Sequence, residues 1–277
     1  MSYRIMTGNF KGGTGKSTNA CLFAYTLAKK GYKTLLLDLD PQADTTKLMF
    51  LTKHNLTDEE LEYKTTFMQS IAKGDLEPII TPITENLFIL PSAPDFRHFG
   101  RYLEGEFPAD FYSRGLVINK LLNKLEEKYE FDYILIDTPP TISEYTDNAV
   151  LSADGIVIVL QTQERSLEGA MTFVEYLQEV YNNYRKDFNI IGILPVMNKK
   201  DASTDLEIMK RAVNEFGKEN MFDIIVPHFE RLKRWDITGI QDIGNESYDI
   251  HDERTLAFYD MLTDELLKRI DMVEKEG

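Results

Sequence analysis

Near the N-terminus, a glycine-rich segment carries lysine and hydroxyl side chains at a spacing that suits a bound phosphate. The segment reads Lys11-Gly12-Gly13-Thr14-Gly15-Lys16-Ser17-Thr18 and lies between an apolar run and a helical pattern. Backbone N–H groups of such a loop converge on phosphate oxygens at the start of a helix. Lys16 can then reach the outer phosphates, and the Ser17 hydroxyl can bind Mg²⁺. A glycine-rich turn without a ligand is the alternative, which the strand context and these two residues disfavour.

The first position of the common pattern G-x-x-x-x-G-K-[ST] is not met, because Phe10 stands there in place of glycine. The loop also carries a second lysine, Lys11, at its start. Lys11 has two interpretations. The first is a solvated charge on the surface. The second is a cation that contacts a phosphate, and its position also allows contact with a phosphate bound by a neighbouring subunit.

Two aspartates, Asp38 and Asp40, follow the apolar run at residues 34–37. The carboxyl ends of parallel strands meet at one edge of a sheet, so we expect these carboxylates near the glycine-rich loop. Carboxylates there can surround Mg²⁺ or orient a water molecule. For Asp38 the alternative is a cap on the next helix or on a turn at Pro41.

A third aspartate, Asp137, ends the apolar run at residues 133–136 and precedes Thr138-Pro139-Pro140. The proline pair ends the strand, so the carboxylate is expected at the same edge of the sheet as the loop. It can hold Mg²⁺ directly or through water. The alternative is an aspartate that caps the turn before Pro139.

Short apolar runs alternate with helix-length amphipathic stretches along the whole chain. This pattern predicts an α/β fold, a doubly wound and mostly parallel sheet flanked by helices. A single domain over residues 1–277 accommodates it. The expected strands are residues 3–7, 34–37, 88–90, 133–136, 156–160, 190–194 and 224–226.

Three segments outside these strands have their own patterns. A helical insertion is expected at about residues 52–85, where Thr57 and Glu60 resemble a capping box and a short helix at 65–73 ends at Gly74. Residues 92–112 contain prolines and glycines in irregular order, which predicts a loop-rich excursion. Residues 255–273 carry apolar side chains at helical spacing and predict a long final helix.

Composition limits the class of protein. The chain has 277 residues, 43% of them hydrophobic, and a formal net charge of −15, so it can bury a large core. It lacks the basic surplus of a dedicated nucleic-acid domain, and any DNA contact must be local. The lone Cys21 cannot form an internal disulfide, which fits a reducing compartment such as the cytoplasm. No run is long enough to cross a bilayer, and no signal peptide is expected.

Three segments, residues 11–18, 37–42 and 134–140, together resemble the deviant Walker A ATPases of the ParA/MinD family, and in particular short ParA-type partition ATPases. The resemblance implies ATP and Mg²⁺ as ligands. It implies catalytic roles for Lys11, Lys16 and Asp40, with Lys11 crossing a dimer interface and Asp40 orienting the attacking water. It implies that Ser17, Asp38 and Asp137 surround the metal.

The resemblance also places nucleotide-binding residues along the chain. They are Lys11, Gly12, Gly13, Thr14, Gly15, Lys16, Ser17 and Thr18, with Asn198 and the loop around Pro227 near the adenine. The segment Asn198-Lys199-Lys200-Asp201 also matches N-K-x-D, a pattern that selects guanine in many GTPases. The longer set of motifs favours ATP over GTP.

Basic residues before the acidic C-terminal stretch are the candidates for DNA contact. Relatives of the ParA type use this region for binding DNA without sequence preference, which implies Arg231, Lys233 and Arg234, with Lys210 and Arg211 as weaker candidates. A solvated charged face is the alternative. The resemblance further implies an ATP-dependent homodimer, a small centromere-binding ParB-like partner, a cytoplasmic and nucleoid-associated location, and no membrane contact.

Two other functions compete with this hypothesis. A MinD-like membrane ATPase needs a basic amphipathic C-terminal helix, and the helix expected here is acidic. A nucleotide-sensing scaffold would bind ATP and dimerise without hydrolysis. An iron–sulfur reductase of related sequence needs two cysteines in each subunit, which the single Cys21 excludes.

Overall fold

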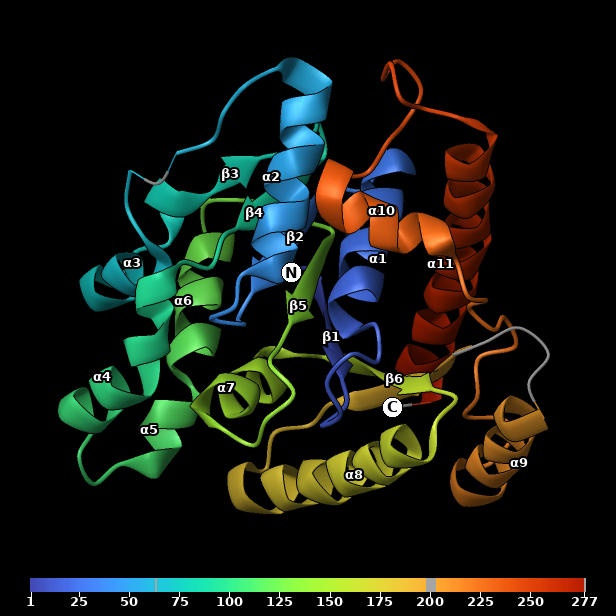
Figure 1. Ribbon diagram of the computed structural model, residues 1–277. Helices are drawn as coiled ribbons and strands as arrows, with labels where there is room; N and C mark the ends of the chain where they lie inside the picture. The colour runs from blue at the N-terminus through green and yellow to red at the C-terminus, as the bar shows by residue number, and fades with distance from the viewer. Residues whose placement is uncertain (63, 198–202, 277) are drawn as a thin grey trace.

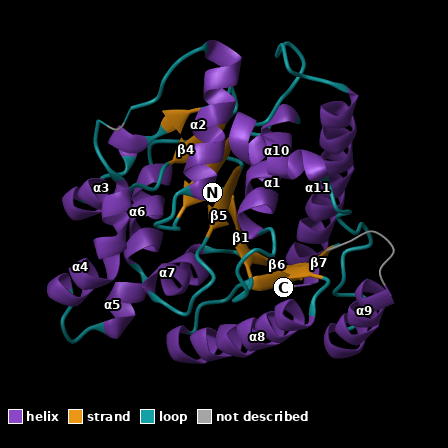
Figure 2. Cartoon of the chain, viewed as in Figure 1, coloured by secondary structure: helices purple, strands orange, loops and turns teal. Residues whose placement is uncertain are grey.

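The centre of the computed structural model, which describes residues 1–62, 64–197 and 203–276, is a seven-stranded sheet. Its spatial order is β3-β4-β2-β5-β1-β6-β7, and all neighbours are parallel except β3 and β4 (Figures 1 and 2). The strands are β1 (Tyr3–Gly8), β2 (Thr34–Asp38), β3 (Thr81–Pro82), β4 (Leu87–Leu90), β5 (Tyr133–Asp137), β6 (Gly155–Gln161) and β7 (Asn189–Val196). The doubly wound, mostly parallel α/β fold expected from the sequence is confirmed.

Helices cover both faces of this sheet. Strands β2 and β5 form buried runs without polar alternation, because each face packs on a separate hydrophobic cluster. One cluster draws on α3 (Phe67–Lys73), α4 (Phe99–Glu106), α6 (Val117–Glu126), α7 (Glu144–Ser152), α8 (Glu164–Tyr184) and α9 (Ser203–Phe216). The other draws on α1 (Lys16–Lys29), α2 (Asp44–Thr57), α10 (Glu230–Thr238) and α11 (Ile250–Glu276).

The segment expected as a helical insertion begins with the second half of α2. Thr57 is the last residue of α2, so the predicted capping box at Thr57 is wrong. The real capping box is one helix further along, where Thr66 and Gln69 exchange hydrogen bonds at the start of α3. The predicted end of that helix at Gly74 is confirmed, since Gly74 adopts a left-handed φ of 66°.

The prediction of a loop-rich excursion at residues 92–112 is wrong. A 3₁₀ turn (Pro94–His98), α4 and the start of α5 (Phe111–Gly115) occupy most of it. Pro94 lies at the first helical position, where its missing N–H costs nothing. Phe96, Phe99 and Leu103 are buried in the core, and this burial stabilises the helical backbone.

Both edges of the sheet differ from expectation. Residues 224–226 form no strand and contribute only an isolated bridge between Val226 and Val196. The backbone N–H groups of Asp223 and Ile224 instead donate to the carboxylate of Glu265 on α11. The seventh strand is β3, a two-residue antiparallel edge that the sequence does not signal.

The last helix, α11, extends the predicted helix in both directions and packs on the sheet. Its buried residues recur at helical spacing, namely Leu256, Tyr259, Leu262, Leu266 and Ile270. Among the helices of the described chain, none is long and apolar enough to cross a membrane.

Candidate functional site

The glycine-rich loop connects the end of β1 to the start of α1, as the sequence predicts. Gly13 and Gly15 have φ values of 74° and 92°, a region that residues with a side chain rarely adopt. Gly15 is the N-cap of α1, and Lys16 is the first helical residue. The N-terminus of α1 therefore opens toward the loop, the arrangement that binds phosphate.

A residue that the sequence analysis missed, Asn9, anchors the loop. Its side-chain Nδ2 donates to the carbonyls of Val159 at 2.9 Å and Ser166 at 3.1 Å. Its Oδ1 accepts the backbone N–H of Lys11 at 2.8 Å. A Cβ at Gly169 on α8 would lie 2.6 Å from that same Oδ1, so only glycine fits there without a shift. Val159, Ser166 and Gly169 are distant from Asn9 in the sequence, and no local pattern signals these contacts.

The Lys16 side chain is folded into the loop. Its residue surface is 6% exposed, and its Nζ donates to the carbonyl of Lys11 at 3.3 Å. Burial lowers the pKa of Lys16, and the nearby carboxylates of Asp137 and Asp40 oppose that change. A cation in this position attracts an anion, because the surrounding carboxylates do not fully compensate its lost hydration.

Asp38 and Asp137 lie side by side as register partners at the ends of β2 and β5. Both are buried, and their mutual repulsion adds to burial in raising the pKa of Asp38 to about 8. Asp38 Oδ2 accepts the backbone N–H of Thr46 at 2.9 Å and its hydroxyl at 2.6 Å. Asp38 therefore holds the first turn of α2, the alternative that its position in the sequence left open. Its place near a metal stays a prediction.

Asp137 has one oxygen engaged and one free. Its Oδ2 accepts the Thr45 hydroxyl at 2.7 Å, while its buried Oδ1 has no partner among the described residues. Burial raises the pKa of Asp137, and the nearby Ser17 hydroxyl lowers it. A buried carboxylate oxygen without a partner is costly, and a divalent cation beside Ser17 would satisfy it. Asp137 and Ser17 thus fit a Mg²⁺ ion.

Asp40 lies beyond the end of β2 and is partly exposed. Its Oδ1 accepts the backbone N–H of Gln42 at 2.9 Å, which fixes the carboxylate without neutralising it. Burial raises the pKa of Asp40, while that hydrogen bond and Lys16 lower it. The second oxygen of Asp40 is thereby available to a water molecule.

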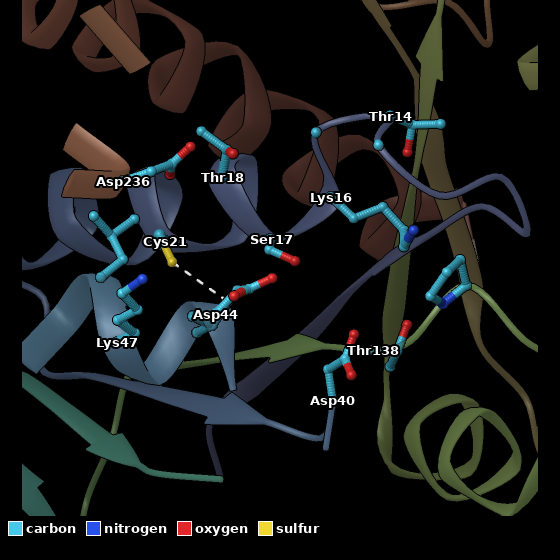
Figure 3. A pocket seen from close by; sticks show the side chains of 15 residues that line it. Thr14, Lys16, Ser17, Thr18, Cys21, Asp40, Asp44, Lys47, Thr138 and Asp236 are labelled. Atoms are coloured by element: carbon cyan, nitrogen blue, oxygen red, sulfur yellow. Dashed lines mark hydrogen bonds between the residues drawn. The ribbon is translucent and has the colours of Figure 1, made fainter. Parts of the chain in front are cut away.

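Lys16, Ser17 and Asp40 line one cavity of about 400 Å³, whereas Asp38 and Asp137 are not among its lining residues (Figure 3). Lys16, Asp40 and Thr138 converge at one end, and Asp44, Lys47 and Asp236 gather at the other. The Thr14 hydroxyl is buried without a partner in the described chain and belongs to the wall. Gly13, Gly15, Ser17 and Thr18 also line the cavity, so the structure brings together most of the predicted loop residues.

The far end of the cavity holds groups that the sequence analysis did not identify. Asp236 comes from α10, and Asp44 and Lys47 come from α2. Burial and then the charge of Asp44 raise the pKa of Asp236, and Lys47 lowers it. Asp44 is only four positions after Asp40 and begins α2, so it was within reach of sequence reasoning. Asp236 was not, since α10 reaches the site only through the fold.

The predicted basic residues lie in different environments. Arg231 is buried, and its guanidinium pairs with Asp249 at 2.6 Å and with Asp252 at 3.4 Å. This geometry gives Arg231 a structural role instead of a surface phosphate contact. Lys233 and Arg234 are exposed on α10.

On α9, Lys210 is exposed, and Arg211 pairs with Glu164. Asn198 lies outside the described residues, as do Lys199, Lys200 and Asp201. Pro227 is half-buried just before α10. Neither Pro227 nor the two α9 residues lie among those that line the 400 Å³ cavity.

A phosphate loop that enters a helix from a central parallel strand, with a buried lysine and carboxylates at the same sheet edge, defines a P-loop nucleotide-binding protein. A family model described as an AAA domain matches residues 2–190. The chain belongs to the ParA/Soj family of deviant Walker ATPases.

The relatives agree with this assignment. The chromosome-partitioning ATPase Soj of Treponema pallidum is 30% identical over 232 residues, which span 84% of this chain and 85% of the relative. A plasmid partition protein from Borrelia burgdorferi bound to AMPPNP has a similar structure, with a TM-score of 0.70, 20% identity and coverage of 97% and 98%. A cobyrinic acid a,c-diamide synthase from Mycobacterium smegmatis with bound ATP analogue and magnesium gives a TM-score of 0.73 at 18% identity, with coverage of 97% and 95%. At these identities the two structures show the shared fold alone.

Proposed function

We propose that the chain is a DNA partition ATPase, which binds ATP with Mg²⁺, dimerises, binds DNA without sequence preference and hydrolyses ATP when a centromere-binding ParB-like protein stimulates it. It works in the cytoplasm on the nucleoid. The observation that carries the proposal is the convergence of Lys16, Ser17 and Asp40 around one cavity at the N-terminus of α1, with the charge of Asp137 acting on Lys16. Family membership and the partition relatives support it.

Phosphate binding is the task of the loop and Lys16. When a triphosphate enters, the Lys16 ammonium exchanges the carbonyl of Lys11, at 3.3 Å, for phosphate oxygens. This exchange is favourable because a charge-assisted hydrogen bond is stronger than one to a neutral carbonyl. Bound Mg²⁺ would neutralise part of the phosphate charge, held by the Ser17 hydroxyl and the free oxygen of Asp137.

Hydrolysis is the task of Asp40. Its carboxylate is fixed by the backbone of Gln42 and lines the cavity beside Lys16. From there it can orient a water molecule toward the outer phosphate. Burial and the charge of Asp44 raise the pKa of Asp40, whereas the hydrogen bond from Gln42 and the charge of Lys16 lower it and favour the ionised form.

Dimerisation is supported by the surface around the loop. Gly12 and Gly13 are exposed, and Gly12 lies close to Pro140 in the segment after β5. The neighbouring Ile142 is 66% exposed, an apolar side chain that a second subunit would cover. Lys11 lies at this same rim with its backbone held by Asn9, so its side chain is the part that can reach across.

DNA binding is assigned to the exposed cations of α10, Lys233 and Arg234. These phosphate contacts would make DNA affinity sensitive to salt. The side chain of Asp236, on the same helix, lines the nucleotide cavity. A change of ligand in that cavity therefore acts on α10, the helix that carries the DNA contacts. This contact links DNA affinity to the bound nucleotide.

Two measurements test the proposal. Light scattering with ATP, with ADP and without nucleotide should give a dimer only with ATP, and Lys11→Ala should weaken that dimer more than it weakens ATP uptake. The ATPase rate should rise with DNA and the partner present, and Asp40→Ala should retain ATP binding and lose the stimulated rate. A constant mass in all three states contradicts dimerisation. A stimulated rate that Asp40→Ala leaves unchanged contradicts the assignment of Asp40, and no hydrolysis under any condition leaves a nucleotide-sensing scaffold.

A further inference from the structure

Besides Asn9, the phosphate loop has a support that comes from the last helix of the chain. Helix α11 lies beside α1 (Figure 1), and both helices belong to the same hydrophobic cluster. The Tyr259 hydroxyl of α11 donates to Oδ1 of Asn19 on α1 at 3.1 Å, and the hydroxyls of Thr263 and Thr26 lie 2.6 Å apart. Because Tyr259 and Thr263 are one helical turn apart, these two contacts fix how α11 is placed along α1.

Asn19 joins Tyr259 to the loop. Its Nδ2 donates to the carbonyl of Gly15 at 2.8 Å, and the same carbonyl accepts the backbone N–H of Asn19 at 2.9 Å. Asn19 is 2% exposed and Tyr259 is 0% exposed. Burial raises the pKa of Tyr259, so its hydroxyl stays protonated and donates. The two partners therefore define the orientation of the Asn19 amide, with its oxygen toward Tyr259 and its nitrogen toward Gly15.

The orientation of the Gly15 carbonyl decides where the N–H of Lys16 points. The peptide bond between these two residues is planar and trans, so its carbonyl and its N–H point in opposite directions. A carbonyl held toward Asn19, within α1, directs the N–H of Lys16 out of the N-terminus of the helix, where the first N–H groups bind phosphate. Gly15 benefits from this support, because glycine has more backbone freedom than any other residue.

Packing alone does not explain an asparagine at position 19. An amide inside an apolar cluster is unfavourable unless both of its polar atoms have partners. An apolar side chain there would pack among the buried residues of α1, such as Ala20 and Phe23, without this requirement. Asparagine also favours a helix less than alanine does. The hydrogen bonds of Asn19 therefore indicate a task at the loop.

We propose that Asn19 and Tyr259 are positioning residues, which hold the peptide between Gly15 and Lys16 in the orientation that binds phosphate. The inference rests on the proposed function in one respect, namely that the loop binds a nucleotide. It makes α11 part of the nucleotide site, although no described residue of α11 lines the 400 Å³ cavity.

Tyr259→Phe tests the proposal because it removes the hydroxyl and keeps the buried ring. Calorimetry measures the binding of ADP with Mg²⁺ and of inorganic pyrophosphate, which reports on the loop without a base. Tyr259→Phe should weaken both ligands about fivefold, the ratio that corresponds to one neutral hydrogen bond. The matched control is Tyr25→Phe, which removes another buried hydroxyl at α1, one that donates to Asp242 at 2.7 Å. This control should keep the wild-type affinities.

A double-mutant cycle shows whether Tyr259 acts through Asn19. Asn19→Ala should weaken both ligands at least as much as Tyr259→Phe does. In the Asn19→Ala background, Tyr259→Phe should cause no further loss of affinity. If the two losses add in the double variant, the proposal is overturned, since Tyr259 would then affect binding by another route.

The amide resonance of Lys16 reports directly on the N–H that is being positioned. In the wild type, its proton should shift downfield when pyrophosphate binds, because the N–H then donates to an oxyanion. The shift should be smaller in Tyr259→Phe and unchanged in Tyr25→Phe. An equal shift in all three proteins would show that the N–H is positioned without Tyr259. This measurement also decides the question if Asn19→Ala does not fold.

Equal affinities in wild type and Tyr259→Phe overturn the proposal, and so does an equal loss of affinity in Tyr25→Phe. Both results leave the proposed function intact, because the wild-type protein still binds nucleotide. A wild-type protein that binds neither ADP nor pyrophosphate contradicts the proposed function and this inference together.

Discussion

The burial of Arg231 leads to a prediction that separates a structural role from a DNA contact. Arg231→Met keeps the aliphatic stem and removes the guanidinium. Asp249 and Asp252 then lose their cation, and the protein should lose stability even without DNA. A residue that only contacted DNA would leave stability unchanged.

The expected loss follows from the two acidic partners. Removing one member of a buried ion pair costs about 3–5 kcal/mol. Asp249 is 41% exposed, so water compensates much of its loss. Asp252 is 0% exposed but keeps hydrogen bonds from Trp235 and from the backbone of Asp249. We therefore expect the lower end of the range, about 3 kcal/mol.

Urea unfolding at neutral pH measures this loss, with Arg234→Met as the matched control. Arg234 is exposed on the same helix, so its replacement should change the free energy of unfolding by less than about 0.5 kcal/mol. A second readout is acid sensitivity. Arg231 lowers the pKa of Asp249 to about 2, so its stabilising effect is present above the unfolded value and is lost as pH falls toward 2. Arg231→Met should abolish that dependence. If Arg231→Met is as stable as the control, the structural role is refuted.

Three further predictions concern the loop, a helix start and pH. Gly169→Ala places a Cβ 2.6 Å from Asn9 Oδ1 and should lower ATP affinity, measured with a fluorescent analogue; unchanged affinity would mean that this contact does not position the loop. Thr66→Ala removes the capping box with Gln69 and should cost about 1 kcal/mol in urea unfolding, and no loss would contradict the cap. The pKa of Asp38 is raised to about 8, so its contribution to stability is present below the unfolded value near 3.9 and is lost as pH rises through 8. The contribution of Asp38 should therefore make the nucleotide-free protein more stable toward urea near pH 5 than above pH 8. If Asp38→Asn has the same pH profile of stability as the wild type, this prediction is contradicted.

The central strands were predictable because they are contiguous apolar runs buried on both faces. The edge strand β3 was not predictable, because it has only two residues. One of them is Pro82, and a proline in the sequence usually indicates that a strand is interrupted. Prolines also misled the reading of residues 92–112. Pro94 begins a helical turn there, and burial of Phe96 and Phe99 decides the local structure.

The candidate site divides in the same way. The loop residues and Asp137 are local motifs, and the sequence predicts where they lie. The groups that support them depend on contacts between distant segments, such as Asn9 with Ser166 and Thr45 with Asp137. Arg231 shows the same limit, because its charge was visible in the sequence and its burial against Asp252 was not.

The order of the strands has a consequence for synthesis on the ribosome. In the finished sheet β5 lies between β1 and β2, so the strand that leads into the loop and the strand that leads into Asp40 do not pair with each other. A nascent chain that stops before Tyr133 leaves β1 and β2 unpaired on the sides that β5 covers in the finished sheet. Nucleotide therefore cannot stabilise the emerging protein until β5 has left the ribosome, and chaperones have their longest opportunity to bind the chain before that moment.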